Sequence, residues 1–432
     1  MTQNEKFRFK RRMERRNLFS GICGADKPVK LVFLLLYLAG FIWVWCKQGV
    51  IRSAGDNMVL LSPILKLVLE NSMTTYLLLG SAVLVFLLVY PFGKKAAQDQ
   101  LQSIGLVNHA GMVPVLLRKY RDKENNRVTV WEFRSQSIPL VTWQDKQSSI
   151  EAALDVSVVK VKYSKGKSRI LLYTVPAQTD LPELLEWKDI CLSQTDFELV
   201  LGESFLGPVK VNLVHIPHIL LGGSTGSGKS ILLKLLLMQA IRKGAIVCIA
   251  DFKGGVDFPA VWHKTCRMCF EETDLLALLT ELVDELERRK SIFRECGCPN
   301  INQYNKATGA ALKRYIFACD EVAEVLDKTG LNKEQKELVS QIESKLAVIA
   351  RQGRAFGIHL ILATQRPDAN ILSGQIRNNI DCRVCGRADN VLSQIILDST
   401  AAAEQIPTDA RGRFLLHDGT VFQGYLFDEE SL

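Results

Sequence analysis

The feature that most constrains the fold is a glycine-rich turn between an apolar strand and an apolar helix, over residues 223–230. The turn fits the spacing G-x-x-x-x-G-K-S, in which glycines let successive backbone N–H groups point inward at an anion. The helix that follows adds unpaired N–H groups and a partial positive charge. An ordinary surface turn would need no Lys-Ser pair at a helix start. The sequence therefore predicts a phosphate-binding loop made of Gly223, Ser224, Thr225, Gly226, Ser227, Gly228, Lys229 and Ser230.

The end of this loop and a later strand carry the side chains that a nucleoside triphosphate needs. Lys229 can reach the β- and γ-phosphates, and the hydroxyl of Ser230 can bind Mg²⁺. The apolar strand 315–319 ends in two carboxylates. We expect Asp320 to complete the Mg²⁺ site and Glu321 to orient and deprotonate the attacking water. An adjacent glutamate favours hydrolysis over phosphoryl transfer to another substrate.

Two further groups complete the expected catalytic set. Gln365 follows the apolar strand 359–363 and is expected to sense the γ-phosphate, although an ordinary polar strand exit has the same composition. Hydrolysis in a ring of subunits also needs a cation supplied by a neighbouring subunit. We take Arg354 as the candidate, while most such arginines only solvate a face. Four arginines lie near this strand and its neighbour: Arg351, Arg354, Arg383 and Arg387.

Two uncharged stretches near the N-terminus, residues 31–46 and 71–93, predict membrane helices. About 20 apolar residues cross a bilayer, so we expect spans at about 31–47 and 71–92. The basic run in residues 1–30 places both termini in the cytoplasm of a multi-pass bacterial membrane protein. The alternatives are a nucleic-acid arm for the basic run, a cleaved signal peptide for the first span and a buried core helix for the second.

The remaining sequence predicts two soluble units after a membrane domain of residues 31–93. Residues 94–178 combine a helical neck with β-branched segments, which indicates a small α+β domain. Residues 179–432 alternate strands with helices, the pattern of an α/β domain with a mostly parallel sheet. The net charge of +8 permits a nucleic-acid partner without requiring one.

Two Cys-x-x-Cys pairs, Cys266/Cys269 and Cys382/Cys385, have a spacing that occurs in zinc sites. Both pairs lie in expected strands, where positions three apart point to opposite faces. We therefore expect buried free thiols rather than a metal site.

Several long motifs together resemble the FtsK/SpoIIIE family of DNA-translocating ATPases. They are IPHILLGGSTGSGKS at 216–230, IADFKGG at 249–255, YIFACDE at 315–321 and ARQGRAFGIHLILATQRPDANIL at 350–372. The resemblance covers roughly residues 195–428. It implies a RecA-like P-loop NTPase motor that assembles as a homohexamer, uses ATP and Mg²⁺, and moves along DNA.

The segments before the motor narrow this resemblance. Division translocases of the family carry four membrane helices and a long linker, whereas this sequence has two expected spans and a short neck. It is therefore more similar to the FtsK-like coupling proteins of conjugative elements. This similarity implies a membrane-anchored, ATP-driven DNA translocase that delivers DNA to a conjugative channel, with a relaxase and type IV secretion-like channel components as partners. DNA contacts would be mostly to the backbone.

Three alternatives stay open for the function. They are a cell-division or chromosome-segregation DNA translocase, a protein-secretion ATPase of the same family, and a non-catalytic membrane scaffold. Charge alone makes Lys253 and residues 328–336 candidates for the pore lining.

Overall fold

The structure is a computed structural model that forms two compact units, Met1–Thr179 and Asp180–Leu432. The expected division into four segments, with boundaries at 30, 93 and 178, stays a prediction. Most of the basic segment 1–30 lies outside the described residues. The described residues are 27–57, 63–89, 94–123, 125–365 and 372–432.

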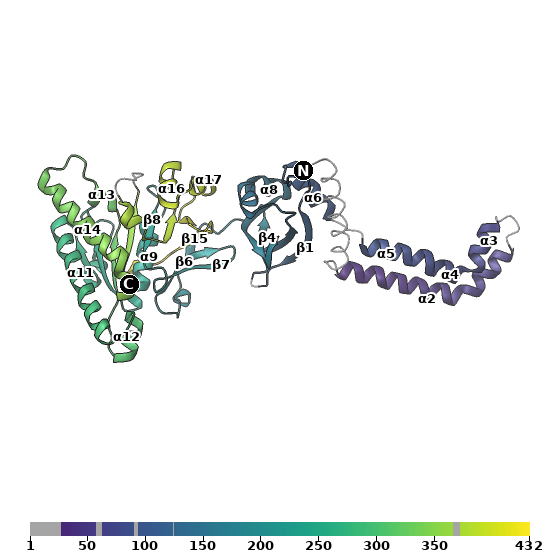
Figure 1. The fold of residues 1–432 in the computed structure, drawn as a ribbon, viewed down its shortest axis with the longest axis horizontal. Helices are drawn as coiled ribbons and strands as arrows, with labels where there is room; N and C mark the ends of the chain where they lie inside the picture. Colours follow the sequence, from purple (N-terminus) through teal and green to yellow (C-terminus); the bar gives the residue numbers. More distant parts are fainter. Residues whose placement is uncertain (1–26, 58–62, 90–93, 124, 366–371) are drawn as a thin grey trace. The chain divides into compact units, whose positions relative to one another are not determined.

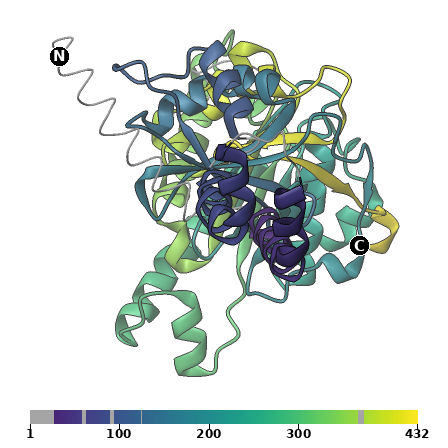
Figure 2. The ribbon, with the colours of Figure 1, turned by 90° about the vertical axis from the view of Figure 1, so that its right-hand side faces the viewer.

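The first unit begins with apolar helices that pack side by side (Figure 1, Figure 2). The rings of Tyr37 and Tyr76 stack with their centres 5.4 Å apart, and the Tyr76 hydroxyl donates to the Tyr37 carbonyl at 2.8 Å. The Tyr37 hydroxyl lies 2.9 Å from the hydroxyl of Ser81. These helices are α2 (Lys27–Asn57), α3 (Pro63–Glu70), α4 (Ser72–Thr75), the π-helical η1 (Tyr76–Gly80) and α5 (Ser81–Val89).

Among the described residues, one helix is long and apolar enough to cross a membrane. It is the 22-residue segment Lys30–Ile51, and only 6% of its most apolar stretch is buried. The second apolar helix, Ser72–Leu87, is shorter. At ~1.5 Å per residue it falls short of the ~30 Å of hydrocarbon in a bilayer. The second span expected at 71–92 is therefore not confirmed, and residues 90–93 lie outside the described part of the chain.

The small domain of the first unit is a four-stranded antiparallel sheet with strand order β1-β2-β4-β3. Helices cover one face of this sheet, where Phe133 and Trp143 pack with ring centres 5.3 Å apart beside the buried Ile150. The elements are α6 (Lys94–Ser103), β1 (Val115–Arg121), β2 (Thr129–Arg134), α7 (Leu140–Asp145), α8 (Gln147–Leu154), β3 (Val156–Ser164) and β4 (Gly166–Pro176).

The second unit is built on a mixed eleven-stranded sheet with the path β10-β9-β11-β12-β8-β13-β14-β15-β6-β7, and β5 pairs with β15. The strands from β10 to β13 are parallel, as expected, but β14, β15, β6 and β7 add antiparallel pairs. Hairpins join β6 to β7 and β14 to β15, and a hairpin always pairs its two strands antiparallel. The strands are β5 (Leu185–Glu186), β6 (Glu198–Ser204), β7 (Gly207–Asn212), β8 (Ile219–Gly222), β9 (Ile246–Ala250), β10 (Arg267–Cys269), β11 (Tyr315–Cys319), β12 (Ile358–Thr364), β13 (Cys382–Cys385), β14 (Arg413–Leu416) and β15 (Val421–Leu426).

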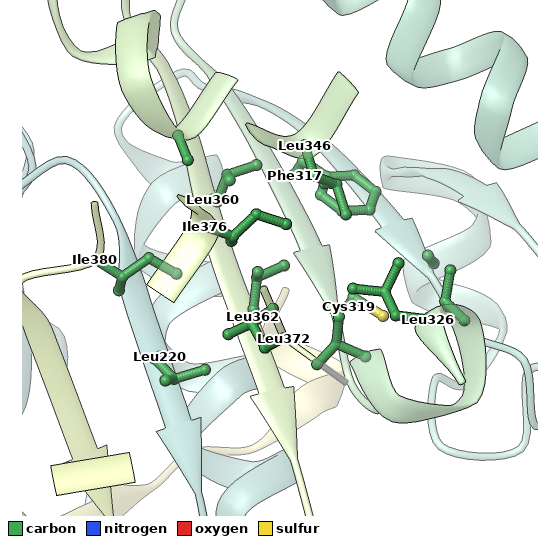
Figure 3. Close-up of a cluster of buried hydrophobic side chains, with 14 of the residues drawn as sticks. Leu220, Phe317, Cys319, Leu326, Leu346, Leu360, Leu362, Leu372, Ile376 and Ile380 are labelled. Carbon is green, nitrogen blue, oxygen red and sulfur yellow. The ribbon is translucent and has the colours of Figure 1, made fainter. Parts of the chain in front are cut away.

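Helices cover both faces of this sheet, so alternate residues of each strand enter different cores. Leu220, Phe317 and Leu362 point into the core beneath α11 and α14 (Figure 3). Their neighbours Leu221 and Ala318 enter the core around α9. The helices are α9 (Lys229–Arg242), α10 (Ala260–Thr265), α11 (Glu272–Glu295), α12 (Ile301–Thr308), α13 (Val322–Leu326), α14 (Lys333–Phe356), α15 (Gly374–Arg377), α16 (Asn390–Leu397) and α17 (Ala401–Gln405), with short 3₁₀ turns η2 (Asp189–Cys191) and η3 (Glu429–Ser431).

The two Cys-x-x-Cys pairs behave as strand geometry predicts. Cys269 and Cys385 lie in the core beneath α11 and α14, whereas Cys266 and Cys382 lie in the core around α9. Burial raises the pKa of each thiol, to about 12 for Cys266 and to about 11 for Cys269. Within the described residues, no three His, Cys, Asp or Glu side chains are grouped to hold a metal ion.

Candidate nucleotide site

The parallel strands bring five polar segments to one edge of the large sheet. Because β9, β11, β12, β8 and β13 are neighbours and run the same way, their carboxyl ends share this edge. Ligands of such sheets bind outside the carboxyl ends of the strands. The residues that follow the five strands are Asp251, Asp320, Gln365, Gly223 and Gly386.

The glycine-rich loop connects β8 to α9 and requires glycine for steric reasons. Gly226 and Gly228 have φ values of 77° and 95°, which side chains rarely adopt. A Cβ on Gly228 would also lie 3.0 Å from Gly412, whose N–H donates to the Ser227 carbonyl at 2.9 Å. The buried hydroxyl of Ser227 has no hydrogen-bond partner among the described residues, so the loop keeps a polar group available for a ligand.

The loop borders a cavity of about 480 Å³. Its lining includes the loop and the start of α9, residues of β14 and β15, and Glu183 with Leu184. Lys253, Asp257 and Gln365 also line it. A cavity of this size is in the range that holds a small-molecule ligand.

Asp320 lies at the centre of the polar side chains at this edge. Its Oδ1 atom is 3.1 Å from Nζ of Lys229 and accepts a hydrogen bond from the Ser230 hydroxyl at 2.9 Å. Its Oδ2 atom is 3.1 Å from Nζ of Lys253, which also contacts Asp257 at 2.9 Å. Burial alone would raise the pKa of Asp320, but the charges of Lys229 and Lys253 outweigh it and lower the pKa. Asp320 is therefore held as a carboxylate.

The site contains a residue whose position was not predicted. Lys253 was a candidate for the pore lining because of its charge, whereas the structure places it beside Asp320 in the nucleotide cavity. Burial alone would lower the pKa of Lys253, but the hydrogen bonds to Asp257 and Asp320 outweigh burial and raise the pKa above its ordinary value. Its motif, IADFKGG, begins at the end of β9 and continues into the loop at the same sheet edge as the phosphate loop. That position was the available signal.

Glu321 is held in one orientation by the end of β12. Its Oε1 atom accepts a hydrogen bond from the Thr364 hydroxyl at 2.7 Å, and its Oε2 atom accepts one from the Gln365 N–H at 2.8 Å. The Gln365 side-chain oxygen in turn accepts a hydrogen bond from the Thr225 hydroxyl at 2.8 Å. A chain of hydrogen bonds thus connects the acid pair after β11 to the phosphate loop after β8.

The four candidate arginines separate in space. Arg387 donates to the carbonyls of Thr225 and Thr408, at 2.6 Å and 2.7 Å, so it braces the phosphate loop of its own chain. Arg354 lies at the end of α14 and donates to the Val214 carbonyl at 3.1 Å, away from this site. Arg351 lines a polar cleft between α14 and α15, and Arg383 pairs with Asp398. Any catalytic contribution from Arg354 would have to reach a neighbouring subunit.

Comparison with known proteins shows which protein family carries this site. The FtsK/SpoIIIE family model matches residues 181–344, which contain the phosphate loop and the acid pair. The solved structure of the pCW3 conjugation coupling protein TcpA, in its monomer form with ATPgS, is 34% identical to this chain. That similarity covers 78% of this chain and 96% of the TcpA chain, with a TM-score of 0.58. The chain belongs to the FtsK/SpoIIIE family.

Family membership makes the chain a P-loop ATPase, and curated relatives extend the comparison. DNA translocase FtsK of Helicobacter pylori (strain J99) is 28% identical over 295 residues, which are 64% of this chain and 34% of the relative. DNA translocase SftA of Bacillus subtilis (strain 168) is 28% identical over 257 residues, 56% of this chain and 26% of SftA. The chain thus spans about a third or less of the length of these FtsK/SpoIIIE relatives.

Proposed function

We propose that this protein is a membrane-anchored, ATP-driven DNA translocase that acts as the coupling protein of a conjugative DNA-transfer system. The observation that carries the proposal is the connected site in which Lys229, Asp320, Glu321 and Gln365 meet at one sheet edge. Similarity to a conjugation coupling protein over 96% of that chain favours this role over the other members of the family.

In this proposal each side chain has one task in ATP hydrolysis. The N–H groups of the loop and the ammonium group of Lys229 bind the phosphates. Glu321, which Thr364 and Gln365 orient, accepts the proton of the attacking water. Gln365 responds to the γ-phosphate because its side chain already contacts the Thr225 hydroxyl in the loop. Its backbone N–H, which donates to Glu321, then transmits a change in that contact to the carboxylate.

Ser230 and Asp320 fit a Mg²⁺ site. Mg²⁺ prefers hard oxygen ligands, and the two side chains lie 2.9 Å apart next to the phosphate loop. The lowered pKa of Asp320 keeps it ionised at neutral pH. When bound, Mg²⁺ would offset the negative charge of the phosphates.

The membrane anchor and the assembly also belong to this proposal. Residues 30–51 form the first anchor, and the second apolar helix completes a hairpin that leaves the ATPase in the cytoplasm. A homohexamer would place Arg354 of one subunit next to the phosphates in its neighbour. DNA bound within such a ring would be contacted mainly at its phosphates, with a relaxase and channel components as further partners.

The central test is ATP hydrolysis by the full chain in detergent or nanodiscs, with and without DNA. We expect duplex or single-stranded DNA to stimulate phosphate release, and Lys229→Ala to abolish it. Lys264→Ala is the matched control, because Lys264 is exposed in α10. Stimulation by a secreted protein but not by DNA would instead indicate a protein-secretion ATPase. Hydrolysis without any response to DNA would contradict the proposal.

The conjugative role has its own test. Deleting the gene from a conjugative element that encodes it should abolish plasmid transfer in mating assays, and the wild-type gene should restore it, whereas Lys229→Ala should not. A deletion that leaves mating intact and disturbs chromosome segregation would favour the cell-division alternative.

The trans role of Arg354 can be tested by mixing subunits. Arg354→Ala alone should lower turnover about 10³-fold, the effect of removing such an arginine. Mixing Arg354→Ala with Lys229→Ala should restore part of the activity, because some sites then combine an intact Lys229 with an intact Arg354 from the neighbour. Absence of recovery in assembled mixtures would assign Arg354 a structural role at the Val214 carbonyl.

A further inference from the structure

The strands of the small domain are strongly basic. There are three basic residues in β1, one in β2, two in β3 and two in β4, and Glu132 is the single acidic residue of the four strands. The nucleotide site uses none of them. A sheet that only supports a core would not require this imbalance, because surface charges of both signs serve solubility equally well.

Many of these cations share the face that the helices leave uncovered. Glu132 accepts hydrogen bonds from both Arg118 and Arg169 at 2.8 Å, so these three side chains lie together. The strand register places Leu171 between Glu132 and Lys162, and it places Lys160 opposite Tyr173. We call this surface the open sheet face. It is defined by Arg118, Tyr120, Lys160, Lys162, Arg169 and Tyr173 around Glu132.

The cations of the open sheet face are accessible and held in place. The side chains of Arg118 and Arg169 are 53% and 44% exposed, whereas Glu132 is 1% exposed. Burial alone would raise the pKa of Glu132, but the hydrogen bonds from Arg169 and Arg118 lower it, so one ionised carboxylate fixes two guanidinium groups. Each guanidinium still has N–H groups directed to solvent, because five donors exceed what one carboxylate oxygen accepts.

Aromatic rings lie between the cations. The guanidinium of Arg118 is 5.8 Å from the ring centre of Tyr120, and Nζ of Lys162 is 4.7 Å from that of Tyr173. By contrast, Lys119 lies over Trp131, which belongs to the core, and burial lowers its pKa. Basic side chains interleaved with aromatic rings on an open sheet are suited to a nucleic-acid strand.

We propose that the open sheet face is a second DNA-binding surface, which contacts the phosphate backbone and is separate from the ATPase unit. The outer strands of a four-stranded sheet are about 14 Å apart, a distance that four or five phosphates of one strand cover at ~3.4 Å each. Arginine forks match phosphate geometry. The choice of DNA as the polyanion rests on the proposed function; the charge and geometry do not.

An anionic membrane is the competing occupant, and the side chains favour DNA. Basic surfaces that bind bilayers combine cations with apolar side chains that insert between lipids. Across the four strands, all of which the structure describes, Tyr120 is the only exposed large apolar or aromatic side chain. The open sheet face therefore offers charge and ring edges without an apolar anchor.

The test uses the full chain in detergent and a fluorescent DNA of about 40 base pairs, without nucleotide. Lys160→Glu combined with Lys162→Glu should weaken DNA binding about tenfold or more at about 100 mM KCl and should reduce the slope of log K against log [KCl] by about two. The matched control, Lys306→Glu with Lys313→Glu, reverses the same charge on exposed residues of the other unit and should change the affinity less than about twofold. Arg118 and Arg169 are left intact, since removing either would leave Glu132 buried with one partner fewer.

Several outcomes decide the inference. If the double lysine variant keeps its melting temperature, its DNA affinity and its salt slope, the inference is overturned. The inference is also overturned if the variant loses binding to phosphatidylglycerol vesicles while its DNA affinity is unchanged. Should the charge-reversed variant not fold, Lys160→Gln with Lys162→Gln must show about half the effect on the slope. Basal ATP hydrolysis should be unchanged in each variant.

The two proposals can fail separately. A chain whose DNA binding depends on Lys160 and Lys162, but whose ATP hydrolysis ignores DNA, would contradict the proposed function and leave the open sheet face as a DNA site. DNA-stimulated hydrolysis together with unchanged DNA binding in the double lysine variant would support the proposed function and would overturn the open sheet face as a DNA site.

Discussion

At the carboxyl edge of the large sheet, Lys229 and Lys253 share the carboxylate of Asp320 beside an open cavity. At the amino edge, His218 and His359 are fully buried, and neither lines the nucleotide cavity. The His359 Nδ1–H donates to the Pro217 carbonyl at 2.9 Å, and its Nε2 accepts from Arg314 at 3.1 Å. Both edges bury titratable groups, but only the first has groups that a ligand can engage.

The difference shows how burial can serve chemistry or stability. At the carboxyl edge the partners are lysine, serine and aspartate side chains, so a triphosphate can replace one contact with another. At the amino edge each ring nitrogen is used by a backbone group or by Arg314. Substitutions at the first edge should therefore alter ATP binding or turnover, and those at the second should alter the free energy of unfolding.

Of the four substitutions that compare the two edges, Glu321→Gln has the largest expected effect. The amide oxygen can still accept from the Gln365 N–H, and the amide NH₂ can donate to the Thr364 hydroxyl, but the side chain can no longer take up a proton. Turnover should therefore fall about 10²- to 10⁴-fold while ATP affinity changes less than about threefold. Phosphate release and binding of a fluorescent ATP analogue measure the two quantities. Glu334→Gln, an exposed change in α14, is the control. Loss of ATP binding in Glu321→Gln would mean that Glu321 supports the loop instead.

Arg314→Met should have its main effect on stability. Arg314 is 4% exposed and donates to the buried His359 and to the exposed Asn302, so its loss leaves the buried Nε2 atom of His359 without a partner. The free energy of unfolding should fall by about 3 kcal/mol, measured by urea unfolding, while turnover at low temperature persists. The exposed Arg294→Met serves as a control. Equal stability of the two variants would remove the contrast between the edges.

The amino edge should also make stability depend on pH. Burial lowers the pKa of His218 from 6.5 to about 4, so the unfolded chain takes up a proton first as the pH falls. Stability is complete above pH 6.5 and is lost as the pH falls towards 4. One such histidine lowers the free energy of unfolding by about 2 kcal/mol between pH 7 and pH 5. His218→Gln should reduce this dependence, whereas the exposed His109→Gln should not.

The smallest effect is expected from Arg387→Lys. Lysine can replace only one of the two hydrogen bonds, to the Thr225 and Thr408 carbonyls, that brace the phosphate loop. Losing one hydrogen bond of about 1 kcal/mol should raise the KM for ATP about fivefold with little change in maximal turnover. Arg351→Lys, outside the nucleotide cavity, should leave KM unchanged. An unchanged KM in Arg387→Lys would show that the loop holds its shape alone.

Much of the site could be predicted because its residues follow apolar strands. Lys229, Asp320 and Gln365 each come after such a strand, and parallel strands end at a common edge. The position of Lys253 was not predicted, although its motif lies at the end of a parallel strand at the same sheet edge. The contact of its side chain with Asp320 depends on the path of the loop after β9, which no local pattern gives. Charge alone pointed to a different role.

The fold shows the same division between local and remote information. Strand–helix alternation predicted the parallel part of the sheet, but not the pairing of β15 with β6, in which Gln423 lies opposite Glu203. Pairing between strands so far apart in sequence leaves no periodic signal. The second membrane span was expected from an uncharged stretch alone, and the π-helical turn at Tyr76–Gly80 within it has no marker in composition.

The contact between Thr225 and Gln365 joins two neutral groups, one of them exposed. A hydrogen bond of this kind contributes only about 1 kcal/mol, so thermal motion can open and close it many times during one catalytic cycle. An ion pair between the same two positions would hold the loop to β12 and would slow the release of each product. Because this hydrogen bond is weak, the phosphate loop and the end of β12 can separate in each cycle.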